Sequence, residues 1–187
     1  MKRLLVLSLL ALAVFATCAA ANPIKGPWGN LVPSPIPTRT DLMICDTSLG
    51  ILNIYVILNM WPGATAVQFS APRPPCFTAT YLADAYPFAV TIGNSQTGVG
   101  IGFGTCRVSP VHVLTMTFLA YGTTPPDCVY PTRADPAYSS WIEIVDCAFM
   151  PHWVGDGGNY INPPEAGCGT IPAETMTWGQ VKSLFTE

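Results

Sequence analysis

The segment 152–160 holds the densest group of side chains that could bind a ligand. Asp156 and Asn159 supply oxygen atoms, and the glycines between them allow close backbone approach, loosely as in a calcium loop. Trp153 and Tyr160 flank these oxygens with rings that can stack on a sugar or a peptide. The candidate binding residues are therefore Trp153, Asp156, Asn159 and Tyr160. A glycine-rich turn closed by its own Asp and Asn side chains is the simpler structural interpretation.

Residue spacing gives metal binding little support. The loop lacks the repeated D-x-D and the final Glu of an EF-hand, so no cofactor is expected and calcium at 152–160 is the alternative. Zinc would need closely spaced ligands, but no two cysteines stand at C-x-x-C spacing, and His112 and His152 are the two histidines. The sequence leaves the identity of any metal open.

Catalytic motifs are equally sparse. The sequence has no G-x-S-x-G elbow, and His112 lies in an apolar, alternating run that is typical of a hydrogen-bonded histidine in a sheet. Carboxylates that could form a glycosidase pair fall in turns, where capping is their usual role: Asp46, Asp84, Asp127, Asp135, Glu143, Asp146 and Asp156. We therefore assign no catalytic residue and expect a protein that is not an enzyme. A small secreted hydrolase using 152–160 is the alternative.

The first 21 residues have the features of a secretory signal peptide. Basic residues at Lys2 and Arg3 precede an uncharged apolar run, residues 4–15, and small alanines follow. The run is shorter than the ~20 residues that span a bilayer, so no membrane span is expected. The mature protein would be secreted, periplasmic or at the cell surface. Alternatively, Cys18 is a lipidated N-terminus, because residues 15–18 resemble a lipobox.

Composition limits the classes of partner. Of 187 residues, 50% are hydrophobic and 10% are charged, against roughly 25% charged in average soluble domains, which argues against disorder and coiled coil. Beyond the leader six basic residues stand against eleven acidic ones, and the basic residues are scattered singly. Such a chain has no basic patch for a polyanion, so nucleic acid is excluded as a partner.

Short strands are expected to build the domain. The 16 glycines and 19 prolines break up long helices, and apolar runs recur between turns at intervals of about ten residues, as in an antiparallel β-sandwich. The sandwich is predicted over 41–170. It would follow an extended, unpaired proline-rich arm over 22–40. Residues 51–58 read as a buried strand that forms a hairpin with 65–70.

Six cysteines remain outside the leader, and this even number predicts three disulfides in an exported chain. They are Cys45, Cys76, Cys106, Cys128, Cys147 and Cys168. If residues 98–104, 111–121 and 141–147 are successive antiparallel strands, the ends of the first and third lie at one sheet edge. Cys106–Cys147 is then the favoured pair, and the pairing of the other four is left open.

Residues 98–104 read Gly-Val-Gly-Ile-Gly-Phe-Gly. The two-residue period of a strand places these glycines on one face and the large side chains on the other. A bare glycine face either lets another element pack closely or accepts an aromatic ring or a ligand, and close packing is the usual reason. The run does not have the G-x-G-x-x-G spacing of a dinucleotide site.

The C-terminal segment changes character after Cys168. Thr177 and Gln180 fit a capping box, and a short helix would place Trp178, Val181, Leu184 and Phe185 on one face. Residues 174–185 resemble the T-W-G-x-[IV]-K-x-L-[FY] tail of uncharacterised exported bacterial β-sandwich proteins. The resemblance implies an extracytoplasmic bacterial protein without an assigned activity, and the tail is either a sorting element or a helix packed on the core.

Together these features predict an all-β, antiparallel sandwich stapled by disulfides, with a proline-rich arm before it and a short helix in the tail, 171–187. The expected function is a secreted structural or interaction module of the bacterial envelope or extracellular space, which binds a protein or a glycan through loops. The oligomeric state is left open.

Overall fold

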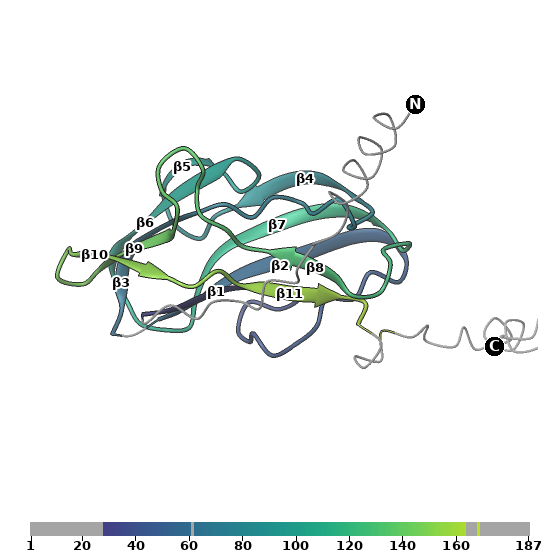
Figure 1. Ribbon diagram of the computed structural model, residues 1–187, viewed down its shortest axis with the longest axis horizontal. Coiled ribbons are helices and arrows are strands. Elements are labelled where there is room, and N and C mark those ends of the chain that lie inside the picture. Colours follow the sequence, from purple (N-terminus) through teal and green to yellow (C-terminus); the bar gives the residue numbers. More distant parts are fainter. Residues whose placement is uncertain (1–27, 61, 164–167, 169–187) are drawn as a thin grey trace, which may run out of the picture.

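The computed structural model describes residues 28–60, 62–163 and 168, and these form an antiparallel β-sandwich (Figure 1). The strands are β1 (Gly29–Ser34), β2 (Leu49–Met60), β3 (Ala64–Phe69), β4 (Ala79–Ala85), β5 (Val90–Asn94), β6 (Gly98–Arg107), β7 (Val111–Tyr121), β8 (Cys128–Pro131), β9 (Ile142–Asp146), β10 (Pro151–Val154) and β11 (Gly158–Ile161). This arrangement is the all-β, antiparallel fold that the sequence predicted.

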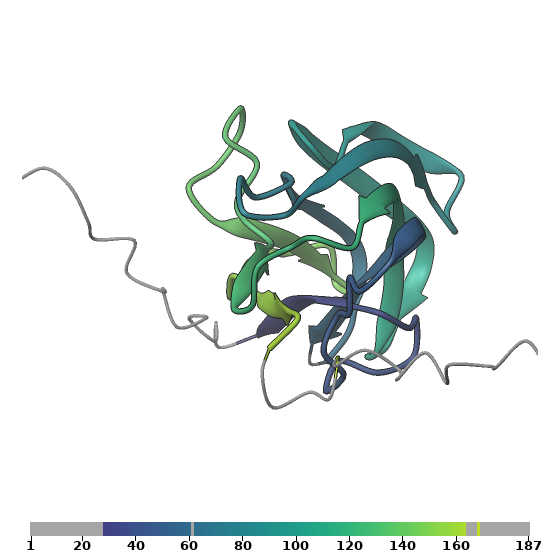
Figure 2. The same ribbon diagram turned by 90° about the vertical axis from the view of Figure 1, so that its right-hand side faces the viewer.

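Two large sheets make the sandwich. The four-stranded sheet has the order β1-β2-β7-β4, and the five-stranded sheet has the order β10-β9-β3-β6-β5. A short ribbon of β11 and β8 lies beside β1. Figure 2, seen nearly along the strands, shows the sheets enclosing a common interior. Alternate residues of β7, such as Met116 and Phe118, are fully buried there, as the two-residue period of a strand requires.

Three disulfides join segments that are distant in sequence: Cys45–Cys168, Cys76–Cys128 and Cys106–Cys147. The third is the favoured pair, but the strand order used to predict it is wrong. β6 and β7 lie in different sheets, and β3 separates β6 from β9. The cysteines meet because Ala64 on β3 lies opposite both Arg107 and Asp146, which are the sequence neighbours of Cys106 and Cys147.

Two other expectations about pairing are also wrong. Residues 29–34 of the predicted arm form β1, which pairs along its length with β2. Pro33 is tolerated because β1 is the edge strand of its sheet. The hairpin expected between 51–58 and 65–70 is absent, since β2 and β3 belong to different sheets. Apolar periodicity shows which residues face inward but not which strands are neighbours.

Several predictions concern residues outside the described ranges. The signal peptide over 1–21, Cys18 and the helix within 171–187 all lie there. Within the part of the chain that the structure describes, no helix is long and apolar enough to cross a membrane.

Candidate functional site

The outer face of the five-stranded sheet carries an open surface with glycines at its centre. Strand register aligns residues across the sheet, and directly paired residues project to the same face. One row runs Val145, Ala66, Gly102, Val90, and the next runs Trp153, Glu143, Gln68, Gly100, Ile92. The residues between the rows, Val67, Ile101 and Ile144, are buried in the core. We call these nine aligned outward residues the glycine face.

The floor of this face is open at Gly100. A methyl group added there would meet no described atom within 4 Å, and one added at Gly102 would first touch the Val90 side chain at 3.3 Å. Close packing, the usual reason for strand glycines, therefore does not account for Gly100. It does account for Gly98, where an added methyl group would lie 2.4 Å from the Asp135 carboxyl group.

Apolar side chains rise around this floor. Val90 and Ile92 on β5 are 60% and 74% exposed, an unusual degree for large aliphatic residues on a strand. With Val145 on β9 they line a shallow cavity of about 220 Å³ over the glycines. Exposed apolar surface shaped into a hollow is typical of an interaction site.

Polar groups on the glycine face are few. Glu143 is the one ionisable side chain in this set, and it is exposed between Trp153 and Gln68 in the second row. Gln68 lies beside it, and its Nε2 atom donates a hydrogen bond of 3.2 Å to Asp135. Because Gln68 is neutral and its Nε2 atom donates to Asp135, Glu143 is the one charged group that the face presents to a ligand.

Trp153 on β10 and Trp141, just before β9, extend the apolar surface at the β10 edge of the sheet. Trp153 is 38% exposed and Trp141 is 55% exposed, and their ring centroids lie 5.4 Å apart at an interplanar angle of 41°. The rings pack on each other at an angle, so they form a ridge and not one flat platform. Tryptophan is enriched among residues that dominate binding energy at protein interfaces.

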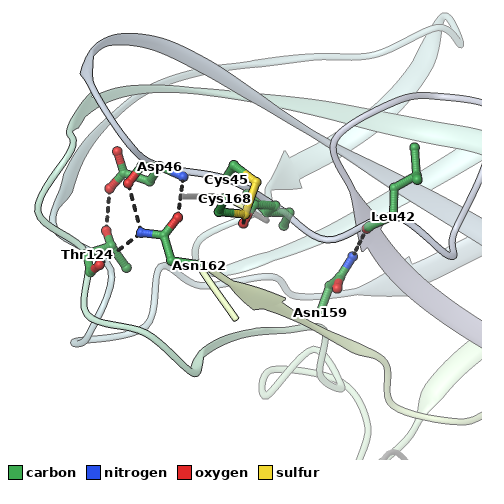
Figure 3. Close-up of a disulfide and its surroundings, with 8 residues drawn as sticks. Leu42, Cys45, Asp46, Thr124, Asn159, Asn162 and Cys168 are labelled. Atoms are coloured by element: carbon green, nitrogen blue, oxygen red, sulfur yellow. Dashed lines mark hydrogen bonds between the residues drawn. A yellow bond between two sulfur atoms is a disulfide. The ribbon is translucent and has the colours of Figure 1, made fainter. Parts of the chain in front are cut away.

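The structure separates the four predicted binding residues. Trp153 joins the glycine face, Asp156 is exposed in the loop between β10 and β11, and Tyr160 is exposed on β11. Asn159 is buried, and its Nδ2 atom donates to the carbonyl oxygens of Pro33 at 2.9 Å and Leu42 at 2.7 Å. Figure 3 shows the bond to Leu42. Asn159 therefore ties the ribbon to β1 and to the segment after it, which is a structural role.

Sequence reasoning missed most of the glycine face. It identified the alternating glycines but not Val90 or Ile92, and it placed Glu143 among carboxylates in turns. That placement is wrong, because Glu143 lies within β9, and strand pairing brings it into one row with Gly100. Across the described ranges, no three His, Cys, Asp or Glu side chains gather as a metal site. Calcium binding at 152–160 stays an untested prediction.

His152, which the hydrolase alternative needs, pairs with Asp146 and not with Asp156. The His152 Nε2 and Asp146 Oδ2 atoms are 2.8 Å apart, and the Trp28 ring stacks on the imidazole with centroids 4.0 Å apart. Asp146 Oδ1 also accepts hydrogen bonds from the backbone N–H groups of Ala148 and Met150, each at 2.8 Å. These contacts fix the turn between β9 and β10, a role that the sequence predicted for carboxylates in turns.

The second histidine is also structural. His112 lies on β7, where its Nε2 atom is 3.0 Å from the Thr115 hydroxyl and its ring meets Tyr55 edge-on at 5.4 Å. Burial lowers the pKa of His112. This environment matches a hydrogen-bonded histidine within a sheet.

The stability of the protein is expected to depend on pH in opposite ways at Asp146 and Asp156, because their pKa values are shifted in opposite directions. The Met150 amide, aided by His152 and Ala148, holds the pKa of Asp146 below its usual value. Its stabilising effect is therefore complete above the usual pKa of about 3.9 and is lost as the pH falls through the lower folded-state pKa. In urea unfolding from pH 2 to 6, the advantage of the wild type over Asp146→Asn is expected to shrink below about pH 4.

Asp156→Asn provides a control in which the stability difference from the wild type is expected to change with pH in the opposite direction. Although Asp156 is exposed, partial desolvation of its carboxyl group raises the pKa of Asp156 against the opposing effect of Arg133. Ionising this carboxyl group therefore disfavours the folded state. The wild type is therefore expected to lose stability relative to Asp156→Asn as the pH rises through that raised pKa. A constant difference between wild type and Asp146→Asn down to pH 2 would contradict the first expectation.

No protein-family model matches the sequence, and no curated protein matches it. Solved structures show distant similarity. A non-cellulosomal cohesin from the archaeon Archaeoglobus fulgidus is 12% identical, with 66% of this chain and 89% of that one covered and a TM-score of 0.47. The sixth cohesin of Acetivibrio cellulolyticus scaffoldin B, solved with a Cel5 dockerin, is 10% identical over 72% and 97%, with a TM-score of 0.43. At such low similarity the fold and the site rest on the strand pairing described above.

Proposed function

We propose that this protein is a secreted, non-enzymatic interaction module that binds a protein partner through the glycine face. The observation that carries the proposal is the open floor at Gly100, within an apolar hollow on the outer face of the five-stranded sheet. A partner side chain or backbone can approach the sheet more closely at a glycine than at any other residue. The binding surface is thus a sheet face, whereas the sequence had suggested loops.

The chemistry of the face favours a protein over a glycan. Sugar binding needs several hydrogen-bonding groups around a flat aromatic platform, but here Glu143 stands nearly alone and the Trp141 and Trp153 rings are tilted. An apolar partner segment would fill the hollow, and a lysine or arginine on it would complement Glu143. The preferred partner is therefore an apolar segment with one basic residue.

Secretion is part of the proposal. Three disulfides within one small domain suit an oxidising compartment outside the cytoplasm. The leader-like first 21 residues and the resemblance of the tail to exported bacterial proteins support the same location.

Selection from a random peptide library displayed on phage tests the proposed partner chemistry. Peptides recovered on the oxidised protein are expected to combine apolar residues with Lys or Arg. Ile92→Asp removes an exposed apolar wall and adds a charge, so it is expected to weaken the best peptide about 30-fold, measured by fluorescence anisotropy. Glu143→Lys is expected to shift the recovered peptides toward Asp and Glu.

A matched control lies in the loop after β6. Val108 is 69% exposed, so Val108→Asp makes the same kind of change away from the glycine face and is expected to leave peptide affinity unchanged. Peptides that bind the wild type and Ile92→Asp equally well would contradict the proposal. Binding restricted to a glycan array, and lost in Trp153→Ala, would replace the protein partner with a sugar.

A further inference from the structure

A second apolar surface lies at one end of the four-stranded sheet, away from the glycine face. Register places Leu49 opposite Tyr121 and Ile51 opposite Leu119 on the outer side of β2 and β7. Leu49 is 72% exposed, Ile51 is 63% exposed and Tyr121 is 45% exposed. We call these four residues the end patch. Aliphatic side chains so exposed on neighbouring strands indicate a surface that another segment covers.

The Cys45–Cys168 disulfide lies next to this patch. Its Cα atoms are 5.5 Å apart. Leu49 is four positions after Cys45 in the sequence, a chain length of at most about 14 Å. A small hollow of about 90 Å³ beside the disulfide is lined by Cys45, Gly50 and Ile51 among others, so it leads from the disulfide to the patch.

Hydrogen bonds hold this anchor in place (Figure 3). The buried Asp46 carboxylate accepts from the Gly122 amide at 2.9 Å and from the Thr124 hydroxyl, directly after β7 ends. Asn162 accepts from the Asp46 amide at 2.7 Å and donates to the carbonyl oxygens of Asp46 and Thr124. These bonds fix Cys168 near the start of β2 and the end of β7, the two strands that carry the end patch.

The chain beyond this point has the length and composition to cover the patch. Residues 169–187 follow Cys168, and among them the sequence predicts a helical face of Trp178, Val181, Leu184 and Phe185. The ten residues from Cys168 to Trp178 can span up to about 33 Å, more than the distance to Leu49 requires. So short a helix is unstable alone and needs a surface on which to pack.

We propose that residues 174–187 dock on the end patch of their own chain as an amphipathic helix. A short tether raises the effective concentration of the segment to the millimolar range, which favours its own chain over another molecule. Four side chains also form too small a surface for a stable dimer, which needs roughly 800 Å² from each partner. The docking is independent of binding at the glycine face.

Photocrosslinking in the full-length, oxidised protein tests this docking. With Trp178 replaced by p-benzoylphenylalanine, irradiation at low micromolar concentration is expected to join position 178 to residues 49–52 or 119–121 within one molecule. Mass spectrometry of the digest identifies the joined peptides. The double variant Leu49→Asp and Ile51→Asp is expected to reduce this product at least tenfold.

The double variant Val90→Asp and Ile92→Asp is the matched control, because it places the same charges on the glycine face and should leave the crosslink unchanged. Mapping the three disulfides in each variant confirms that the sandwich has formed. Crosslinks into the glycine face, a crosslinked dimer, or no crosslink in the wild-type background would each overturn the proposal.

Discussion

Replacing Gly100 by valine is expected to strengthen the fold and to weaken partner binding at the same time. Glycine in a strand interior is destabilising, whereas valine favours the strand conformation. Because nothing described lies within 4 Å of a methyl group added at Gly100, the gain in unfolding free energy is expected to be about 0.5–1 kcal/mol. The branched side chain would stand inside the hollow and is expected to reduce peptide affinity at least about 30-fold.

Gly50 offers a matched control on the opposite sheet. It also lies within a strand and has no described atom within 4 Å of an added methyl group. Gly50→Val is therefore expected to give a similar gain in urea unfolding without any loss of peptide binding. If Gly100→Val bound the selected peptides as tightly as the wild type, the glycine face would not be the binding site. If it destabilised the protein, an element would cover that position.

If Gly100→Val raises stability and weakens binding, partner binding would explain why glycine occupies position 100. A strand position where a larger residue improves the fold but impairs binding is an example of the trade-off between stability and activity. The same comparison at Gly98 would be uninformative, because the nearby Asp135 carboxyl group and a φ of 139° both disfavour any side chain there.

Local patterns predicted the strands well because the side chains of a strand alternate between its two faces, so its own residues show the two-residue period. The alternation over 111–121 matches β7, and the glycine alternation over 98–104 matches β6. The same patterns could not assign strands to sheets, since pairing depends on residues distant in sequence. The favoured disulfide shows this limit, because β3 and not β7 brings Cys106 to Cys147.

The candidate site was only partly predictable for the same reason. Glu143 lies 43 residues beyond Gly100, and two strand pairings through β3 bring them into one row. Asn159 had the right chemistry for a ligand in a glycine-rich loop, but its amide is bonded to carbonyl groups of Pro33 and Leu42. That role could not be foreseen while residues 22–40 were expected to be unpaired.

Replacing Phe118 by alanine is expected to have the largest effect on stability. The Phe118 side chain is fully buried on β7, and rings of Phe77, Tyr81 and Tyr130 surround it edge-on with centroids 5.1, 5.7 and 5.8 Å away. Removing its ring loses buried apolar area and leaves a cavity, which costs about 3–5 kcal/mol of unfolding free energy at such sites. Urea unfolding followed by circular dichroism measures the change.

The neighbours of Phe118 determine where in this range the cost falls. Tyr130 cannot readily move into the space, because its hydroxyl donates a hydrogen bond of 2.9 Å to the Ala71 carbonyl and the Cys76–Cys128 disulfide ties the two segments that hold Tyr130 and Phe77. A cavity that cannot collapse gives a loss near the upper end. Phe149→Ala, at a side chain that is 77% exposed, is the control and should change stability by less than about 0.5 kcal/mol. A loss below about 2 kcal/mol in Phe118→Ala would mean that this ring cluster repacks and is not the rigid centre of the core.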